Sequence, residues 1–265
     1  MPNAPGLIAM TRAVPRSLER CELSHLARQP IDPARAAEQH RRYEETLAEL
    51  GCTVERLPAM PDHPDSVFVE DTAVVLPDIA VITRPGAVSR RAETESVAEA
   101  LESHLPLAFI RPPGTLDGGD VLCMDQCIHV GASRRTNPEG IRQFRDLVSP
   151  RSYQVRVIAV SACLHLKTAV TAVADGTVLL NPAWVEPAAF KGLEIIEVHP
   201  DEPFAANALR VGDAVIHPAA CPLTRRQLEQ QGIDVRTVES DELAKAEAGL
   251  TCCSILIAAQ PGAGT

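Results

Sequence analysis

The chain has 265 residues, of which 45% are hydrophobic, so it can form one large domain or two small ones around a sizeable core. Its 35 acidic and 25 basic residues give a formal net charge of -10. This balance argues against a nucleic-acid or anionic-membrane partner, because both favour a basic face, and it is compatible with a cationic small substrate.

The sequence contains no run of 18 or more apolar residues, so no membrane-spanning helix is expected. The first residues, MPNAPGLIAMTRAV, lack a basic leader followed by an apolar segment and a cleavage site. The eight cysteines have irregular spacings. Together these features predict reduced thiols in a cytoplasmic protein.

The first half of the chain predicts strands alternating with helices. Asp32 as N-cap and Pro33 at the first position begin a helix that Gly51 ends. Two apolar runs joined by a short turn are typical of a hairpin. The elements expected here are a strand within residues 6–14, a helix over 32–51, a hairpin over 72–86 with its turn at Pro77-Asp78, and a helix over 89–105.

The second half repeats this pattern. Asn137 caps one helix, and a Thr-x-x-Gln capping box begins another at Thr224. The hairpins cover residues 120–133, 168–182 and 207–219, with turns at Asp125-Gln126, Asp175-Gly176 and Gly212-Asp213. The helices cover 137–148, 224–232 and 240–249, and a last strand covers 253–259.

The two ends of the chain each carry half of a fifth unit. Pairing the last strand with the first would close a ring of five similar units. No Gly/Ser-rich linker or charge block divides the sequence, so a single α/β domain over residues 1–265 is expected, with residues 258–265 as a flexible tail.

Residues 63–71, HPDSVFVED, place carboxylates around an apolar core. If the segment is extended from residue 66, Asp65 and Asp71 share one face, and Phe68 and Glu70 share the other. Carboxylates beside buried apolar residues need a cation or hydrogen-bond donors. On its own, the segment favours a loop with solvated acids and one core phenylalanine.

Residues 114–122, GTLDGGDVL, place Asp117 and Asp120 around two glycines, which permit a sharp bend or a close approach to a ligand. The alternative is an ordinary turn. His165, in CLHLKTAV, stands before a strand. A lone histidine in an apolar run is typical of a core, and a catalytic role requires a nucleophile and acids nearby, because histidine exchanges protons near neutral pH.

Two arginine pairs, Arg90-Arg91 and Arg134-Arg135, follow predicted strands. Most such pairs are solvated, but two arginines that converge suit a substrate carboxylate through paired hydrogen bonds. The adjacent Cys252 and Cys253, in GLTCCSILI, are either small core hydrophobes or include a nucleophile.

A structural zinc site is not favoured, because Cys123, Cys127 and His129 lack a Cys-x2-Cys spacing and a matching second pair. A serine hydrolase is not favoured either, since the sequence has no Gly-x-Ser-x-Gly motif. A Walker loop and a dinucleotide-binding glycine motif are also missing from the sequence.

Together, these segments resemble the dimethylarginine dimethylaminohydrolases, within the superfamily of amidine-modifying enzymes that includes arginine deiminase and glycine amidinotransferase. The motifs occur in family order from about residue 12 to 257: PDSVFVEDTAVV, ITRPGAVSRR, TLDGGDVL, SRRTN, LHLKTAV, AAN and LTCCS. The resemblance implies the pentein fold, an α/β propeller of five ββαβ-like units around a pseudo-fivefold axis.

The resemblance also implies roles for individual residues. Cys252 matches the nucleophile, His165 the general acid/base, and Asp117 the acid of the catalytic centre, where some members carry glutamate. The residues implied to bind the substrate are Asp65, Phe68, Glu70 and Asp71 around the guanidinium, Arg90 and Arg135 on the carboxylate, Leu23 in a lid loop, and the backbone of Ala246 near the amino group.

The implied reaction is hydrolysis of dimethyl-L-arginine and monomethyl-L-arginine to citrulline and the methylated amine, through a covalent S-alkylthiouronium. It involves a small-molecule substrate and no metal or organic cofactor. Two alternatives stay open, an arginine deiminase-type activity and a catalytically silent ligand-binding homologue. A homodimer is also left open.

Overall fold

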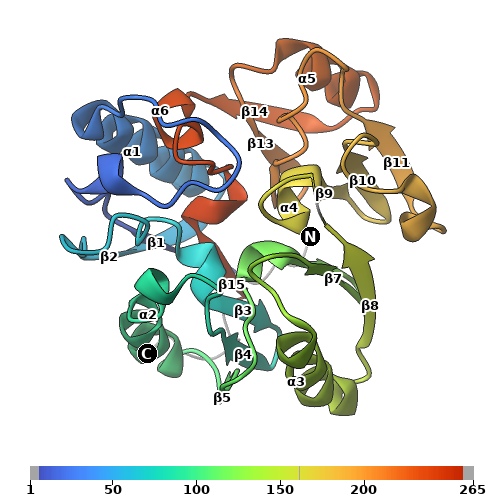
Figure 1. Cartoon of the computed structure of the whole chain (residues 1–265). Coiled ribbons are helices and arrows are strands. Elements are labelled where there is room, and N and C mark those ends of the chain that lie inside the picture. The colour runs from blue at the N-terminus through green and yellow to red at the C-terminus, as the bar shows by residue number, and fades with distance from the viewer. Residues whose placement is uncertain (1–5, 161, 259–265) are drawn as a thin grey trace.

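The computed structural model describes residues 6–160 and 162–258. The described residues form five three-stranded sheets of one design, arranged around a central axis (Figure 1). In each sheet two strands pair antiparallel, and the second of them pairs in parallel with a third. The expected five-unit α/β propeller is confirmed.

The strands divide among the sheets in chain order, apart from the last strand. The sheet that contains both chain ends consists of β15 (Ile255–Ala258), β1 (Leu7–Arg12) and β2 (Cys52–Leu57). The next two are β3 (Ala73–Leu76), β4 (Ile79–Ile82) and β5 (Leu107–Phe109), then β6 (Val121–Met124), β7 (Cys127–Ala132) and β8 (Gln154–Ala159). The last two are β9 (Val170–Ala174), β10 (Thr177–Leu180) and β11 (Glu194–Glu197), then β12 (Leu209–Val211), β13 (Ala214–Pro218) and β14 (Asp234–Val238).

Closure of the ring depends on the pairing of the two chain ends. β1 pairs antiparallel with β15, with Leu7 opposite Ala258 and Met10 opposite Ile255. This confirms the expected pairing of the last strand with the first. The four expected hairpin turns are confirmed as well, because each lies in the two-residue gap between the paired strands. Of the expected tail, Ala258 belongs to β15, and residues 259–265 lie outside the described residues.

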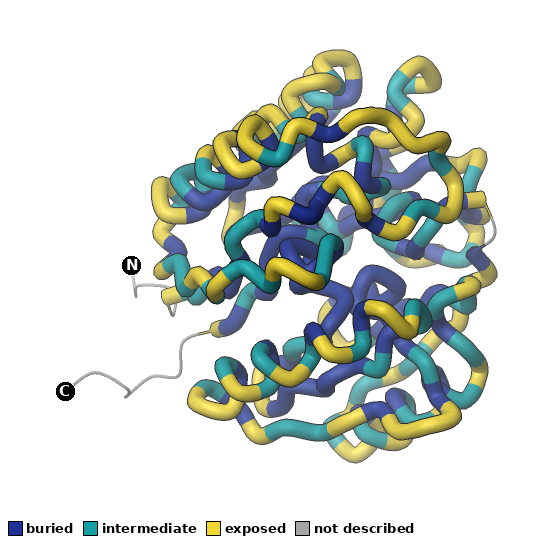
Figure 2. Tube along the Cα trace, turned by 60° about the vertical axis from the view of Figure 1, so that its left-hand side comes forward, coloured by how far each residue is buried: buried dark blue, intermediate teal, exposed yellow. Residues whose placement is uncertain are grey.

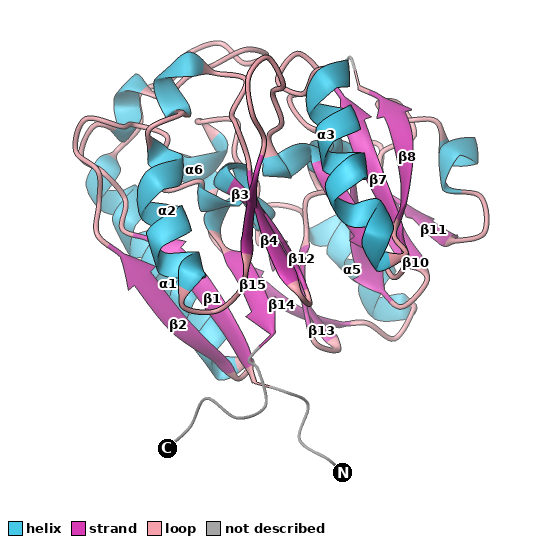
Figure 3. Ribbon diagram, turned by 90° about the horizontal axis from the view of Figure 1, so that it is seen from below, coloured by secondary structure: helices cyan, strands magenta, loops and turns pink. Residues whose placement is uncertain are grey.

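A helical segment connects the second strand to the third in each sheet, and the longer of these segments cover the outer sides of their sheets (Figure 3). These segments are α1 (Pro33–Glu49), α2 (Glu93–Glu102), α3 (Pro138–Val148), the short 3-10 helix η6 (Pro187–Phe190) and α5 (Pro222–Gln230). Exposed residues gather on the outer helices and loops, and buried ones line the interior (Figure 2). No helix in the described part of the chain is both long and apolar enough to cross a membrane.

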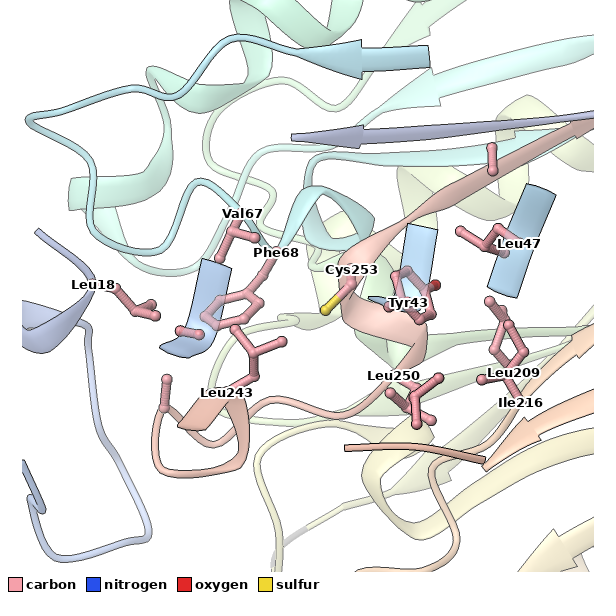
Figure 4. Packing of buried hydrophobic residues seen from close by; sticks show 14 of the residues in the cluster. Leu18, Tyr43, Leu47, Val67, Phe68, Leu209, Ile216, Leu243, Leu250 and Cys253 are labelled. Atoms are coloured by element: carbon pink, nitrogen blue, oxygen red, sulfur yellow. The ribbon is translucent and has the colours of Figure 1, made fainter. Parts of the chain in front are cut away.

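Helix α1 shows how the sequence produces these elements. The Asp32 side chain accepts hydrogen bonds from the backbone N–H groups of Ala34 and Arg35, and Gly51 has a φ of 91°, so both expected ends are confirmed. The buried Tyr43 and Leu47 lie four residues apart on its inner face. They pack in one apolar cluster with Phe68, Leu250 and Cys253 (Figure 4).

Three local expectations were wrong. The Thr224 capping box does not form, because Pro222 begins α5 two residues earlier and the Thr224 hydroxyl accepts a bond from the His199 N–H. The helix expected over 240–249 is only α6 (Asp241–Ala244). The helix expected over 89–105 is divided into the 3-10 turn η3 (Val88–Arg90) and α2.

Candidate active site

Short helical turns precede the innermost strands and meet near the central axis. They are η2 (Val69–Thr72) before β3, η4 (Gly118–Asp120) before β6, α4 (Leu166–Ala169) before β9 and η7 (Thr251–Cys253) before β15. η2 contacts both η4 and η7, and η4 contacts α4. The repeated fold thus brings four sequence-distant motifs into one place.

The segment 66–71 does not have the extended form that the sequence analysis considered. It forms a turn followed by η2, whose four residues are all buried. In a 3-10 turn consecutive side chains point in different directions, unlike the two-face alternation of a strand. Asp71 consequently lines the pocket beside Cys252, whereas Glu70 lines a separate cavity.

The two adjacent cysteines occupy different environments. Cys252 is half-buried and lines the pocket, and its Sγ accepts a hydrogen bond from the Gly249 N–H at 3.4 Å. Burial raises the pKa of its thiol well above the ordinary value, and the Glu70 and Asp71 carboxylates raise the pKa further. Cys253 is fully buried in the apolar cluster of Figure 4, and burial also raises its pKa. Only Cys252 therefore faces the pocket.

His165 lies between two buried carboxylates. Its Nε2 is 3.0 Å from Oδ2 of Asp117, and its Nδ1 is 3.7 Å from Oδ1 of Asp71. Burial by itself lowers the pKa of His165, but Asp71, Asp117 and Asp120 outweigh it and raise the pKa to about 9. The imidazole is thus protonated at neutral pH and can donate a proton.

The paired glycines before β6 permit this arrangement. A Cβ on Gly119 would lie 2.6 Å from Nδ1 of His165 and 2.8 Å from Oδ1 of Asp71, and a Cβ on Gly118 would lie 2.0 Å from the Glu70 carbonyl oxygen. The Gly119 N–H also donates to Asp71 Oδ1 at 3.0 Å. The close approach expected of these glycines is therefore made to the site's own side chains and backbone.

Asp120, quoted in the motif but given no role, fixes the neighbouring segments. Its Oδ1 accepts from the Leu166 N–H at 2.9 Å, and its Oδ2 accepts from the hydroxyls of Ser133 and Thr136, both at 2.6 Å. Leu166 directly follows His165, so these bonds hold the backbone next to His165 against the turn that follows Asp117.

Arg90 is buried within a network of acceptors. Its Nη1 donates to Asp71 Oδ2 at 2.5 Å, and its Nε and Nη2 donate to Glu93 Oε2 at 3.1 and 2.9 Å. Nη2 also donates to the backbone carbonyls of Asp65 and Phe68. Among the described residues Nη1 has only the Asp71 bond, so its second N–H is the donor left for a ligand.

Arg135 lies closer to the rim and has fewer bonds. Its Nη2 donates to the Ser24 hydroxyl at 3.2 Å, and its Nη1 is 4.0 Å from Oδ2 of Asp117. Its side chain is 12% exposed, against 4% for Arg90. Of the two arginines, Arg135 therefore has the guanidinium with more donors free for a ligand.

A loop over residues 22–26, called the rim loop below, lies at the rim of the pocket. The Glu22 N–H donates to Asp65 Oδ2 at 3.1 Å, and the Glu22 carboxylate accepts from the Ser89 hydroxyl at 2.7 Å. The Glu247 carboxylate accepts from three successive backbone N–H groups of the same loop, those of Ser24, His25 and Leu26. Glu247 has a φ of 60°, which an L-residue seldom adopts, so this turn is held by its contacts.

Most of the predicted site residues meet in this one pocket. Those that line it are Asp65, Phe68, Asp71, Arg90, Arg135, His165, Ala246 and Cys252. Asp117 lies behind the pocket against His165, Glu70 faces away from it, and Leu23 packs on the apolar cluster around α1. The sequence reading missed Glu22, Leu164, Glu247 and Ala248, which are also pocket-lining.

Asp71, Asp117 and His165 are the one group in the described part of the chain whose candidate metal-binding atoms lie within 4.8 Å of one another. Asp71 already accepts bonds from Arg90 and Gly119, and His165 bonds to Asp117. The Arg90 guanidinium already supplies a positive charge beside Asp71. The donor set therefore suits proton transfer through His165 better than a metal centre.

Comparison with known proteins agrees with this geometry. A family model described as "N,N dimethylarginine dimethylhydrolase, eukaryotic" matches residues 23–185. An N(G),N(G)-dimethylarginine dimethylaminohydrolase of Streptomyces coelicolor is 38% identical over 257 residues, covering 96% of this chain and 97% of that protein. The chain belongs to the dimethylarginine dimethylaminohydrolase family. The family member of Pseudomonas aeruginosa is 36% identical over 234 residues, covering 88% of this chain and 91% of its own.

Solved structures of the dimethylarginine dimethylaminohydrolase family share the fold. A cysteine-to-serine mutant of the Pseudomonas aeruginosa enzyme, complexed with citrulline, matches with a TM-score of 0.90 and 34% identity, over 94% of this chain and 98% of that one. The N-terminal domain of ArgZ, an arginine dihydrolase from cyanobacteria, has a TM-score of 0.85 at 18% identity, over 95% of this chain and 97% of that one. That second likeness concerns the fold alone.

Proposed function

We propose that the protein hydrolyses dimethyl-L-arginine and monomethyl-L-arginine to L-citrulline and dimethylamine or methylamine, using Cys252 as nucleophile. The observation that carries this proposal is the position of His165 between the Asp71 and Asp117 carboxylates, which raise its pKa, in the pocket that Cys252 lines. The relatives named dimethylarginine dimethylaminohydrolase support the choice of substrate. The eight free cysteines favour a reducing, cytoplasmic setting.

Substrate recognition uses opposite charges at the two ends of the ligand. A guanidinium requires acceptors, and Asp65 and Asp71 in the pocket wall provide them, with Phe68 packing beside the cation. Arg135 and the free N–H of Arg90 hold the substrate carboxylate. The Ala246 carbonyl accepts from the amino group, Leu23 contacts the substrate through the rim loop, and Glu70 acts on the guanidinium through its charge.

The raised thiol pKa determines how the reaction begins. Without substrate, burial and two carboxylates keep Cys252 protonated. A bound guanidinium brings a positive charge next to Sγ, which lowers the thiol pKa so that the proton leaves to solvent. The nucleophile is thus formed mainly when the correct cation is present. This arrangement protects the thiol from other electrophiles.

The covalent steps then use one histidine twice. The Cys252 thiolate attacks the guanidinium carbon and forms a C–S bond, giving a tetrahedral adduct. The His165 imidazolium gives its proton to the departing amine as the C–N bond breaks, which leaves an S-alkylthiouronium. Neutral His165 next takes a proton from water, whose oxygen adds to the same carbon. The C–S bond then breaks as the proton of the new hydroxyl leaves to solvent, which releases citrulline and the thiolate and leaves His165 protonated again.

Two alternatives to this function are distinguished by the amine that is released and by whether any product forms. An arginine deiminase-type enzyme would release ammonia from arginine, and a silent homologue would bind ligand without turnover. Asp117, His165 and Cys252 form an intact set here, which favours catalysis. The two arginines favour an amino acid over agmatine, which has no carboxylate for them to bind.

The test is citrulline formation from dimethylarginine, monomethylarginine, arginine and agmatine, each offered separately. Turnover of the methylated arginines, lost in Cys252→Ser, would support the proposal, with Cys253→Ser as the matched control that keeps substantial activity. Turnover of arginine alone would indicate an arginine deiminase-type activity instead. Absence of citrulline from every substrate, with ligand still bound, would support the silent homologue.

A further inference from the structure

A second cavity, of about 220 Å³, lies along the central axis behind the pocket. Glu70 and Thr251 line this cavity, whereas their chain neighbours Asp71 and Cys252 line the substrate pocket. The turns η2 and η7 therefore separate the two spaces. Lys167, which the reaction described above does not use, also lines the second cavity, two residues after His165.

Lys167 and Glu70 form an ion pair that reaches the nucleophile's own turn. Lys167 Nζ lies 2.5 Å from Glu70 Oε1, and the other oxygen, Oε2, accepts from the Thr251 hydroxyl at 2.7 Å. Thr251 directly precedes Cys252. Asn207 completes the network, since its Nδ2 donates to the Lys167 carbonyl and to Thr251 Oγ1, and its Oδ1 accepts from the Thr251 N–H.

The charges of Lys167 and Glu70 also act on the Cys252 thiol. Glu70 is the largest source of the electrostatic repulsion that opposes ionisation of Cys252, ahead of Asp71. Burial alone lowers the pKa of Lys167, but Glu70 outweighs it and raises the pKa, to which Cys252 also contributes. Lys167 is therefore a cation within electrostatic range of Sγ. Among the described residues, the other charged or titratable groups that line the pocket or interact with the thiol are Tyr43, Glu22, Asp65, Arg90, Arg135, His165, Glu247 and Cys253.

We propose that Lys167 is a positioning residue for the nucleophile: its ammonium offsets the Glu70 carboxylate, so that Cys252 can ionise when the substrate arrives. This inference rests on the proposed role of Cys252. Without the ammonium, the negative charge of Glu70 would be uncompensated. This carboxylate accepts a hydrogen bond from the hydroxyl of Thr251, the residue before Cys252. A single cationic substrate would then have to overcome two carboxylates instead of one.

An ion pair kept only for stability makes a different prediction. If the pair serves the fold alone, Lys167→Met and Glu70→Gln both break it, and both would affect Cys252 in the same direction. If its charge serves the nucleophile, the two substitutions act with opposite sign. Removing the cation disfavours the thiolate, and removing the anion favours it. The sign of the two effects therefore distinguishes the explanations.

The experiment measures alkylation of Cys252 by iodoacetamide against pH in the full chain without substrate, followed on the peptide that carries Cys252. The reacting species is the thiolate, so the rate reports its population. We expect Lys167→Met to slow alkylation at a fixed pH below the thiol pKa by about tenfold or more, and Glu70→Gln to accelerate it. The double variant Lys167→Met/Glu70→Gln should return to within about threefold of the wild-type rate, because no charge is left unpaired.

Lys167→Arg is the charge-preserving control and should keep the wild-type alkylation profile. The double variant also guards against misfolding, since it leaves no buried unpaired ion. Shifts of the same sign in both single variants, or an unchanged profile in both, would overturn the role of Lys167. Because alkylation needs no substrate, that result would leave the citrulline assay intact. Opposite shifts without citrulline formation would instead refute the proposed function.

Discussion

Nε2 of His165 and Oδ2 of Asp117 lie 3.0 Å apart, with side chains only 5% and 0% exposed. A carboxylate at this distance stabilises the imidazolium and fixes which nitrogen bears the bonded proton. Nδ1 lies 3.7 Å from Oδ1 of Asp71, and both residues line the pocket. The histidine is thus anchored through one nitrogen and kept charged by both carboxylates.

Replacing Asp117 by asparagine should lower activity mainly through His165. Loss of the carboxylate charge lowers the His165 pKa, because Asp117 is among the groups that raise it. We expect kcat to fall by roughly 100-fold, the scale of general acid–base catalysis. The alkaline limb of the pH–rate profile should move to lower pH, since the imidazolium is then lost earlier. Citrulline formation measured across the pH range would show both effects.

Asp117→Glu is the matched control for this charge effect. It keeps the carboxylate on a longer side chain, so the alkaline limb should stay near its wild-type position even if kcat falls. An Asp117→Asn variant with an unshifted alkaline limb would contradict the role assigned to the carboxylate.

Replacing Arg135 by alanine should weaken binding of the substrate carboxylate without unfolding the protein. Its guanidinium is near the rim and holds one hydrogen bond, to Ser24 Oγ, among the described residues. We expect KM for methylated arginine to rise by about 30- to 100-fold, as for loss of a charged hydrogen bond, with a smaller change in kcat. Steady-state kinetics, with Arg134→Ala at the exposed neighbouring position as control, would check this. A KM equal to that of the control would show that Arg135 does not bind the substrate carboxylate.

Replacing Glu247 by alanine should loosen the loop over the pocket. Its carboxylate holds the N–H groups of Ser24, His25 and Leu26. Without it, hydrogen exchange at these three amides should accelerate by about tenfold or more, because they lose the only acceptor they have among the described residues. KM should rise as well, since the loop closes the rim. Glu239→Ala makes the same charge change at an exposed position and should leave exchange in the loop unchanged. Unaltered protection in Glu247→Ala would show that the loop is held by other contacts.

The sequence could predict the repeated hairpins because their signals are local. Two-residue turns such as Asp175-Gly176 lie between apolar runs, and Gly176 has the positive φ that such turns require. The start of α1 was predicted for the same reason, since Asp32 caps it within three residues. The short α6 was overestimated because the polar SDELAKAEAG segment ends at the left-handed Glu247, whose partners lie more than 200 residues earlier.

The site was predictable only in part, since its geometry depends on distant contacts. Residue types and order placed Cys252, His165 and Asp71 in one pocket through the family resemblance. The buried turn around Asp71 could not be predicted from its own segment, because Arg90 bonds to the carbonyls of Asp65 and Phe68 and holds a turn that no local pattern indicates. Lys167 was missed for the same reason, since its partner Glu70 lies 97 residues away.

Protonation of His165 should also stabilise the fold in a defined pH window. Its pKa rises from 6.5 to about 9 on folding, so the folded state binds the proton more tightly. The stabilisation is fully present below pH 6.5 and is lost as the pH rises through about 9, by roughly 3 kcal/mol. Urea unfolding at a series of pH values should show this loss in the wild type, whereas His165→Gln, which cannot titrate, should show a flatter curve over the same window. The cysteines also ionise in the unfolded chain as the pH approaches 9, but His165→Gln keeps all of them, so the difference between the two curves reports the histidine. Parallel curves for the two proteins would mean that His165 is neutral in the folded state, and the proton for the leaving amine would then have to come from another group.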